Sequence, residues 1–166
     1  MGALVQAPER FAARRTTRSA GATRRLGVRL GELLEPGDVV ALLGDLGAGK
    51  TQLIRGACEG AGVAPHEVAS PSFAIVAQYR GRLPVFHADL YRVADEDELH
   101  ATGFFDLVGG PGAVLVEWAD RVPGALPAER LDLRLSHDDA RPSVRHLEAI
   151  ATGARHVALA RTLLGR

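Results

Sequence analysis

The chain has 166 residues, a hydrophobic share of 46% and a charged share of 24%, values typical of one soluble globular domain with a real core. Its formal net charge is zero, so no global field favours nucleic acid. The single cysteine, Cys58, excludes a disulfide framework and a cysteine-based zinc site. No apolar run approaches the ~20 residues of a membrane span. We therefore expect a cytoplasmic protein with no membrane partner.

Charge is unevenly distributed along the chain. Up to Arg29 there are seven arginines and one acidic residue, Glu9. We interpret residues 1–22 as a flexible basic arm that precedes a single domain over residues 23–166. Four acidic residues stand in a row from Asp95 to Glu98. This second stretch has two interpretations, a solvated acidic surface or a surface on which a partner docks.

In chain order, apolar residues at helical spacing first predict a helix from Arg25 to Leu34, which a Pro-Gly turn ends. The all-apolar run from Val39 to Leu43 predicts a strand buried on both faces. A loop follows over residues 44–49, and then a helix from Thr51 to Ala61. Alternating residues predict a strand that ends at Tyr79.

The second half of the chain is dominated by strands. A short helix is expected from Asp95 to Thr102, with Asp95 as its N-cap. The other expected elements are strands at Leu83 to Ala88, Ala113 to Val116, Leu131 to Leu135 and Val144 to Ile150, and a helix at His156 to Leu164. Helices alternate with strands early, and strands follow one another later. This order predicts an α/β protein with a partly parallel sheet and antiparallel additions.

Residues 42–54 read LLGDLGAGKTQLI and contain a nucleotide-binding pattern. Gly44, Gly49, Lys50 and Thr51 match G-x-x-x-x-G-K-[ST], and the expected buried strand and helix flank the match. The glycines let backbone N–H groups curl around phosphates, Lys50 reaches the β- and γ-phosphates, and the Thr51 hydroxyl binds Mg²⁺. Lys50 is the only lysine in the chain. A longer, planar guanidinium would not replace its compact ammonium.

A P-loop of this kind also needs an acidic residue to hold magnesium, usually at the end of a buried strand. Two candidates are Glu117, which closes AVLVE, and Asp89, which closes PVFHAD. The alternative for either residue is an acid that merely caps a turn. Because Glu117 closes the more apolar strand, we assign it to the metal. We assign Asp89 to the hydrolysis step at the γ-phosphate.

The sequence favours ATP over GTP as the nucleotide. GTPases read guanine with an N-K-x-D type of motif, and this motif cannot exist here because Lys50 is the only lysine. Asp106 and Gly109 do match D-x-x-G. That pattern is short and common, and here it precedes the Glu117 strand.

The loop, together with SPSF at 70–73, HADLYR at 87–92 and VEW at 116–118, resembles the TsaE family. These proteins are bacterial P-loop ATPases required for the threonylcarbamoyladenosine modification of tRNA. The resemblance runs from about Thr23 to about Arg145, with the motifs in the same order. It implies a P-loop NTPase fold, with a central, mostly parallel sheet, flanking antiparallel strands and helices on both faces.

The resemblance also implies residue roles. It places Thr51 and Glu117 on Mg²⁺ and Asp89 at the hydrolysis step. It implies a switch-like segment from Ser70 to Phe73 that faces the γ-phosphate. Around ATP it places Ser19, Ala20, Leu46, Gly47, Ala48, Gly49, Lys50, Thr51, Ser70 and Trp118, with Ser19 and Ala20 near the adenine.

The function that the resemblance implies is a Mg²⁺-dependent ATPase subunit. It would drive a complex of the TsaD and TsaB proteins through turnover. Whether it contacts tRNA itself or only through these partners stays open at this point. One alternative is a small-molecule kinase that uses the same loop, in which Arg80, Arg82 and Arg92 could form a lid. Another is a nucleotide-gated binding module with negligible hydrolysis.

Overall fold

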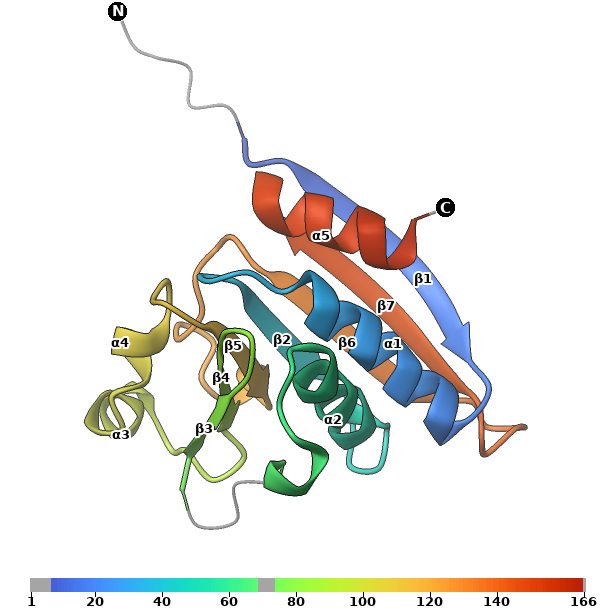
Figure 1. Ribbon diagram of the computed structural model, residues 1–166, viewed down its shortest axis with the longest axis horizontal. Coiled ribbons are helices and arrows are strands. Elements are labelled where there is room, and N and C mark those ends of the chain that lie inside the picture. Colours follow the sequence, from blue (N-terminus) through green and yellow to red (C-terminus); the bar gives the residue numbers. More distant parts are fainter. Residues whose placement is uncertain (1–6, 69–73, 166) are drawn as a thin grey trace, which may run out of the picture.

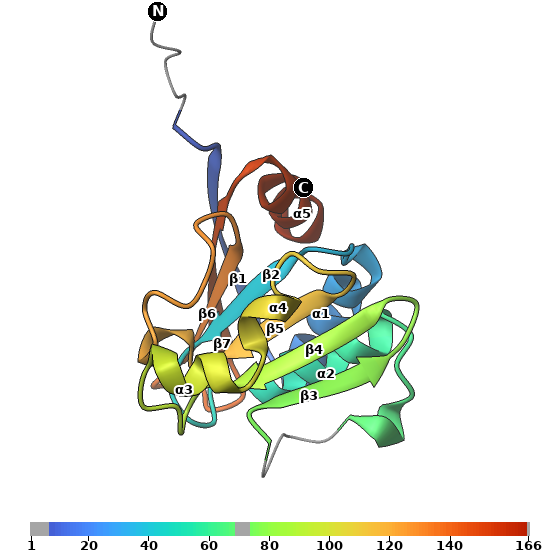
Figure 2. The ribbon, with the colours of Figure 1, turned by 90° about the vertical axis from the view of Figure 1, so that its left-hand side faces the viewer.

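The computed structural model describes residues 7–68 and 74–165, which form one seven-stranded sheet with helices on both faces (Figures 1 and 2). The strands are β1 (Arg10–Thr17), β2 (Val39–Leu43), β3 (Val76–Arg80), β4 (Pro84–Asp89), β5 (Ala113–Glu117), β6 (Leu131–His137) and β7 (Arg145–Thr152). The α-helices are α1 (Ala20–Leu33), α2 (Lys50–Gly60), α3 (Glu96–Ala101), α4 (Phe104–Leu107) and α5 (Ala154–Leu164). Short 3₁₀ helices are η1 (Pro65–Glu67) and η2 (Ala119–Arg121).

The strand order is β1-β7-β6-β2-β5-β4-β3. The central strands β6, β2, β5 and β4 run parallel. Antiparallel strands flank them, β7 and β1 at one edge and β3 at the other. This topology confirms the predicted mostly parallel sheet with antiparallel additions. The apolar runs of β2 and β5 lie at its centre and are buried except for the half-buried Leu43, as parallel strands covered on both faces require.

Each face of the sheet has its own hydrophobic core. Helices α1, α2 and α5 cover one face, where Leu30, Leu53 and Leu163 pack against strand residues. On the other face, α3 and α4 contribute Leu99 and Phe104 to a smaller cluster over β4 and β5. Figure 2 shows the sheet between α1 and α2 on one side and α3 on the other. Within the described residues, no helix is both long and apolar enough to cross a membrane.

The N-terminal segment differs from its predicted structure. Residues 1–22 were expected to form a flexible arm, but Arg10–Thr17 form the edge strand β1, paired with β7 along its whole length. The alternation in β1 is weak because arginines occupy most outward positions, and only Phe11, Ala13 and Thr17 are even partly buried. Helix α5 packs against this strand and stabilises it. Pairing with a strand more than a hundred residues away is a long-range contact that local composition does not reveal.

Helix boundaries follow capping residues. Helix α1 begins at Ala20 rather than Arg25, because the Ser19 hydroxyl accepts a hydrogen bond from the Ala22 N–H at 3.0 Å. Asp95 caps α3 as predicted, accepting from the Glu98 N–H at 2.9 Å. Helix α4 was not predicted, since it is a single turn. Cys58 is a buried small residue as expected, and burial raises its pKa to about 12.

Helices α1 and α2 approach so closely that their contact requires glycine. A Cβ atom on Gly27 or Gly31 of α1 would lie closer than 3.0 Å to the backbone of α2. A Cβ on Gly56 or Gly60 of α2 would meet the backbone of α1 in the same way. This contact matters for the site because α2 begins at the predicted nucleotide-binding loop and α1 forms the side wall of that loop.

We expect Gly31→Ala to destabilise the fold by about 1–3 kcal/mol, because backbone atoms of Ala57 and Ala61 cannot move aside for a methyl group. Gly21→Ala in the same helix is the matched control, since its nearest neighbours lie at 3.5 and 3.9 Å. Alanine favours helix over glycine, so the control should be neutral or stabilising by up to about 1 kcal/mol. Urea unfolding followed by circular dichroism measures both. Equal effects would show that the helix contact is not tight.

Candidate functional site

The loop between β2 and α2 forms a concave backbone surface. Gly44 and Gly49 have φ angles of 132° and 107°, in the region that favours glycine. A side chain on Gly44 would also strike the Leu135 carbonyl of β6. Gly49 occupies the N-cap position of α2 without a side-chain hydrogen bond, so the first N–H groups of the helix stay available. Such N–H groups, with the helix dipole, form an anion-binding site.

Lys50 lies inside this loop and is only 5% exposed. Its Nζ donates hydrogen bonds to the carbonyl oxygens of Gly44 at 2.5 Å and Asp45 at 2.9 Å. Burial lowers the pKa of the ammonium, and the neighbouring carboxylate of Glu117 opposes this shift more strongly than any other acid. The lysine therefore sits where the loop, the strand-end acid and a bound anion would meet.

The aromatic ring of Trp118 contacts the Lys50 ammonium. The Lys50 Nζ lies 4.4 Å from the centroid of the Trp118 ring, which is a cation–π contact. Trp118 has φ 55°, the one positive value among the described non-glycine residues. This left-handed conformation costs about 1–2 kcal/mol in a non-glycine residue. It turns the indole toward Lys50 and against the ring of Tyr91, with centroids 5.0 Å apart.

The two predicted strand-end acids lie side by side. Asp89 at the end of β4 is in register with Glu117 at the end of β5, and Glu117 is also in register with Leu42 of β2. The carboxyl ends of these parallel strands therefore meet the loop at one edge of the sheet, where ligands of open α/β sheets bind. Thr51 in the first turn of α2 is exposed at the same end.

Glu117 and Asp89 differ in their surroundings. Glu117 is 6% exposed, and its Oε2 lies 2.8 Å from Nε2 of the buried His87. A ring N–H at Nε2 orients one carboxylate oxygen and leaves the other free. Asp89 is half-buried and its Oδ1 accepts the Tyr91 N–H at 3.0 Å. A held, buried carboxylate suits a metal ligand, and a partly open one suits a group that acts on water.

A small pocket of about 240 Å³ adjoins the loop on the side of α1. Ala20 and Thr23 line it from α1, Arg145 from the start of β7, and Ser143 from the turn that precedes β7. Arg145 also donates to the Gly47 carbonyl at 3.4 Å. Ala20 thus lies beside the loop, whereas Ser19 does not line this pocket and caps α1 instead. Their predicted position near the adenine stays a prediction.

The structure brings most of the predicted residues together and adds several. The loop residues 46–51, Asp89, Glu117 and Trp118 share one edge of the sheet, and the Leu46 side chain is 87% exposed at the loop tip. Ser70 and the rest of the predicted switch segment lie outside the described residues. His87 and Arg145 were missed as site residues. His87 stood inside the quoted HADLYR motif, but Arg145 is one of 19 arginines and carries no local signal.

The donor atoms at this edge fit a hard cation. In the described ranges, no group of three or more His, Cys, Asp and Glu side chains converges on a metal position. The oxygens of Thr51, Glu117 and Asp89 are nevertheless the kind that Mg²⁺ prefers, and Mg²⁺ usually takes its remaining ligands from phosphate and water. A magnesium ion bound together with a phosphate group is consistent with this arrangement.

Fold and loop together define the P-loop NTPase fold: a buried strand, a glycine loop with its lysine, and a helix on a mostly parallel sheet. A family model, "Threonylcarbamoyl adenosine biosynthesis protein TsaE", matches residues 17–146. The chain belongs to the TsaE family.

Relatives and a solved structure agree with this assignment. The chain is 40% identical over 119 residues to the tRNA threonylcarbamoyladenosine biosynthesis protein TsaE of Treponema pallidum, covering 72% of this chain and 87% of that protein. It is 41% identical over 130 residues to the Bacillus subtilis TsaE, covering 78% and 79%. A crystal structure of Bacillus subtilis YdiB superposes with a TM-score of 0.72 and 31% identity, over 94% of this chain and 95% of that one.

Proposed function

We propose that the chain is a Mg²⁺-dependent ATPase that drives a TsaD–TsaB complex through turnover during threonylcarbamoyladenosine modification of tRNA. The observation that carries the proposal is the position of Lys50. Its buried ammonium lies between the loop carbonyls, the Trp118 ring and the edge that holds Glu117 and Asp89. A positive charge at this position, inside the loop between β2 and α2, favours the binding of a triphosphate.

Each residue contributes to phosphoryl transfer in a way that its surroundings support. The loop N–H groups would hold the phosphates, and Lys50 would neutralise charge on the β- and γ-phosphates. Glu117 and Thr51 would hold magnesium, which supplies further neutralisation of the phosphate oxygens. Asp89 would orient the water that attacks the γ-phosphorus. The bond from that phosphorus to the β–γ bridging oxygen breaks, and the products are ADP and inorganic phosphate.

The kinase alternative lacks one of its expected parts. Arg82 was a candidate for a lid over the nucleotide, but its Nη2 donates to the carbonyls of Gly31 at 3.0 Å and Leu34 at 3.1 Å. It therefore caps the C-terminal end of α1. An arginine used in this way is not available to close over a phosphate.

Incubation with ATP and Mg²⁺ followed by product separation tests the proposal. We expect slow release of inorganic phosphate from the chain alone and faster release with TsaD and TsaB present. Trp118 is the only tryptophan and lies 4.4 Å from the Lys50 ammonium, so its fluorescence should change when nucleotide binds. Transfer of phosphate to a small acceptor would show a kinase. Binding without turnover under every condition would show a nucleotide-gated binding module.

The acidic stretch Asp95 to Glu98 is the expected docking surface for the partners. Two of its residues have structural roles: Asp95 caps α3, and Glu98 accepts the Ala94 N–H at 2.8 Å. Reversing all four charges would therefore disrupt the helix start as well as the surface. Glu96 and Asp97 are exposed and carry no capping bond.

We expect Glu96→Lys/Asp97→Lys to weaken co-purification with TsaD and TsaB at least about tenfold while leaving ATP binding unchanged. The reason is charge reversal on a surface apart from the phosphate loop. Arg80→Glu, at the end of the edge strand β3, is the control for a general change of charge. Intact association with reduced ATP binding would place the docking surface elsewhere.

A further inference from the structure

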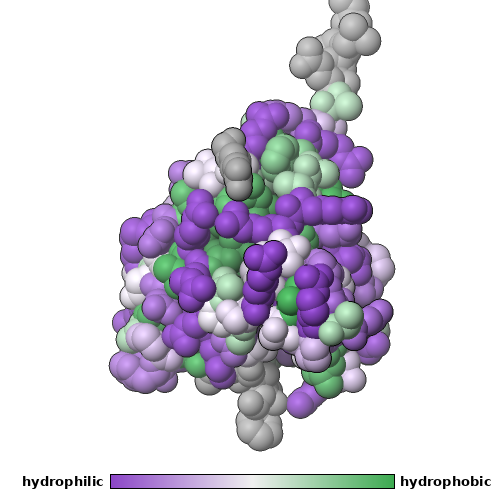
Figure 3. Space-filling view, turned by 90° about the vertical axis from the view of Figure 1, so that its right-hand side faces the viewer, coloured by the Kyte–Doolittle hydropathy of each residue, from purple (hydrophilic) through white to green (hydrophobic). Residues whose placement is uncertain are grey.

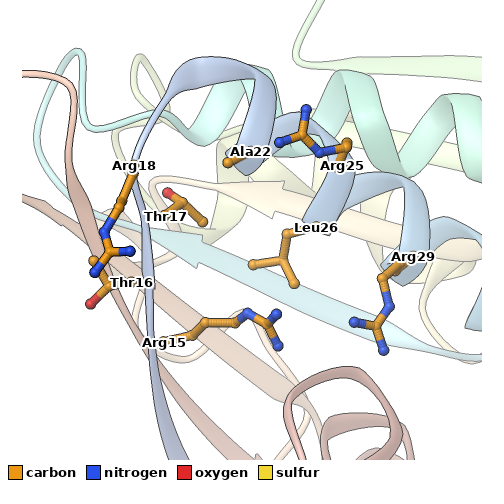
Figure 4. A pocket seen from close by; sticks show the side chains of 8 residues that line it. All are labelled: Arg15, Thr16, Thr17, Arg18, Ala22, Arg25, Leu26 and Arg29. Carbon is orange, nitrogen blue, oxygen red and sulfur yellow. The ribbon is translucent and has the colours of Figure 1, made fainter.

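A pocket of about 410 Å³ lies between β1 and α1, and arginines surround it (Figure 4). Arg15 and Arg18 reach it from β1 and the turn that follows, and Arg25 and Arg29 from successive turns of α1. We call these four residues the basic cradle. Thr16, Thr17, Ala22 and Leu26 complete the lining, which contains no acidic residue.

Among the described residues, the arginines of the basic cradle have no acidic partner, although nearby arginines form ion pairs. Arg14 forms an ion pair with Glu148 at 2.9 Å, and Arg24 with Glu59 at 2.9 Å. Arg15, Arg18 and Arg25 form no ion pair or hydrogen bond within residues 7–68 and 74–165. Arg29 has a single 3.4 Å contact with the Thr162 carbonyl. Like charges gathered without a counter-charge repel one another, so an anionic partner would be attracted to this position.

The chemistry of the lining fits phosphate groups rather than a small polar molecule. The Thr17 hydroxyl is already bonded to Thr23 at 2.7 Å, and the Thr16 hydroxyl lies 3.3 Å from a His146 ring nitrogen. Guanidinium groups are therefore the main donors left, and their planar fork binds phosphate oxygens in pairs. Figure 4 shows Arg15 and Arg29 extending toward each other below Leu26, with Arg25 above.

The four arginines of the basic cradle are spread along an extended surface, as the binding of an anionic chain requires. Arg25 and Arg29 are four residues apart on α1, which spaces their Cβ atoms by about 6 Å, similar to the spacing of successive phosphates along an RNA strand. Arg15 and Arg18 continue the charge onto the edge of the sheet. In the space-filling view of this side of the molecule, hydrophilic side chains cover much of the face and apolar atoms lie between them (Figure 3).

The basic cradle is separate from the candidate nucleotide site but shares a wall with it. Ala20 and Thr23 of α1 line the pocket beside the loop, whereas Ala22 and Leu26 line the basic cradle. The Thr17–Thr23 hydrogen bond joins β1 to α1 between the two pockets. An anion in the basic cradle would therefore lie on the opposite side of α1 from the phosphate loop.

We propose that the basic cradle binds the phosphate backbone of RNA, so that the chain contacts tRNA directly. The proposal rests on the proposed function for the identification of this RNA as tRNA. Contacts of this kind position the nucleic acid without reading its bases, because the lining offers charge and few groups for base edges. Binding should therefore depend strongly on salt and weakly on sequence.

Fluorescence anisotropy with a labelled, unmodified tRNA transcript tests the proposal across a series of salt concentrations. The test variant is Arg18→Gln/Arg25→Gln, because both side chains are exposed and neither forms an ion pair or hydrogen bond within the described residues. We expect its affinity to fall about tenfold or more at 0.1 M salt. The slope of log K against log salt should decrease by about 0.7–0.9 for each arginine removed.

The matched control is Arg80→Gln/Arg134→Gln, which removes two exposed arginines outside the basic cradle. It should bind tRNA as the unaltered chain does. Equal losses in both double variants, or no binding by the unaltered chain at low salt, would overturn the proposal. Unchanged tRNA binding combined with lost TsaD–TsaB association would instead assign the basic cradle to an acidic protein surface. ATP hydrolysis, measured in parallel, should be unaffected, and its absence from the unaltered chain would count against the proposed ATPase alone.

Discussion

Replacing Lys50 by alanine is expected to reduce ATP hydrolysis by about 10²–10⁴-fold, the loss typical of a preorganised group that stabilises charge in the transition state. The ammonium is 5% exposed and directed by two loop carbonyls, so neither water nor a neighbouring cation can take its place. Phosphate release at saturating ATP and Mg²⁺ measures the effect. Circular dichroism checks that the variant keeps its fold.

Lys50→Arg keeps the charge and is the informative companion variant. We expect it to fail as well, because a longer planar guanidinium cannot fit between the Gly44 and Asp45 carbonyls and the Trp118 ring, which lies 4.4 Å from the ammonium. Near-normal turnover by the arginine variant would show that charge alone is needed. The compact shape of the single lysine would then have no functional reason.

The second large effect separates the two strand-end acids, because a metal ligand supports nucleotide binding while a water-orienting group acts mainly in the transition state. We expect Glu117→Ala to weaken Mg²⁺-dependent ATP binding by about tenfold or more, with metal-free nucleotide binding little changed. Asp89→Ala should bind MgATP normally and hydrolyse it about 10²–10⁴-fold more slowly. Titration of a fluorescent ATP analogue with and without Mg²⁺, beside a phosphate-release assay, measures both.

Isosteric variants control for a loss of structure in the two alanine variants. Glu117→Gln can still accept the His87 hydrogen bond, and Asp89→Asn can still accept the Tyr91 N–H. They should repeat the effects of the alanine variants, since each removes only the negative charge. If Asp89→Asn loses the magnesium dependence and Glu117→Gln keeps it, the two roles must be exchanged.

Features that depend on neighbouring residues were predictable from the sequence alone. The apolar run from Val39 to Leu43 became β2 with the predicted bounds, and the Asp95 cap formed as expected. Gly44 and Gly49 adopt the positive φ values that the loop pattern implies. Spacing along the chain carries this information, because strand periodicity, capping and tight turns are decided over a few residues.

Only the tertiary structure decided which distant residues meet. Strand β1 forms because it pairs with β7 and packs against α5. Its arginine-rich sequence contains no pattern that predicts this pairing. Arg145 reaches the loop because an antiparallel strand from the end of the chain returns beside β6. The sequence by itself determined the phosphate loop and its lysine. The fold determined the register that sets Asp89 beside Glu117 and the packing that gathers four arginines at one pocket. Both depend on contacts between segments far apart in the chain.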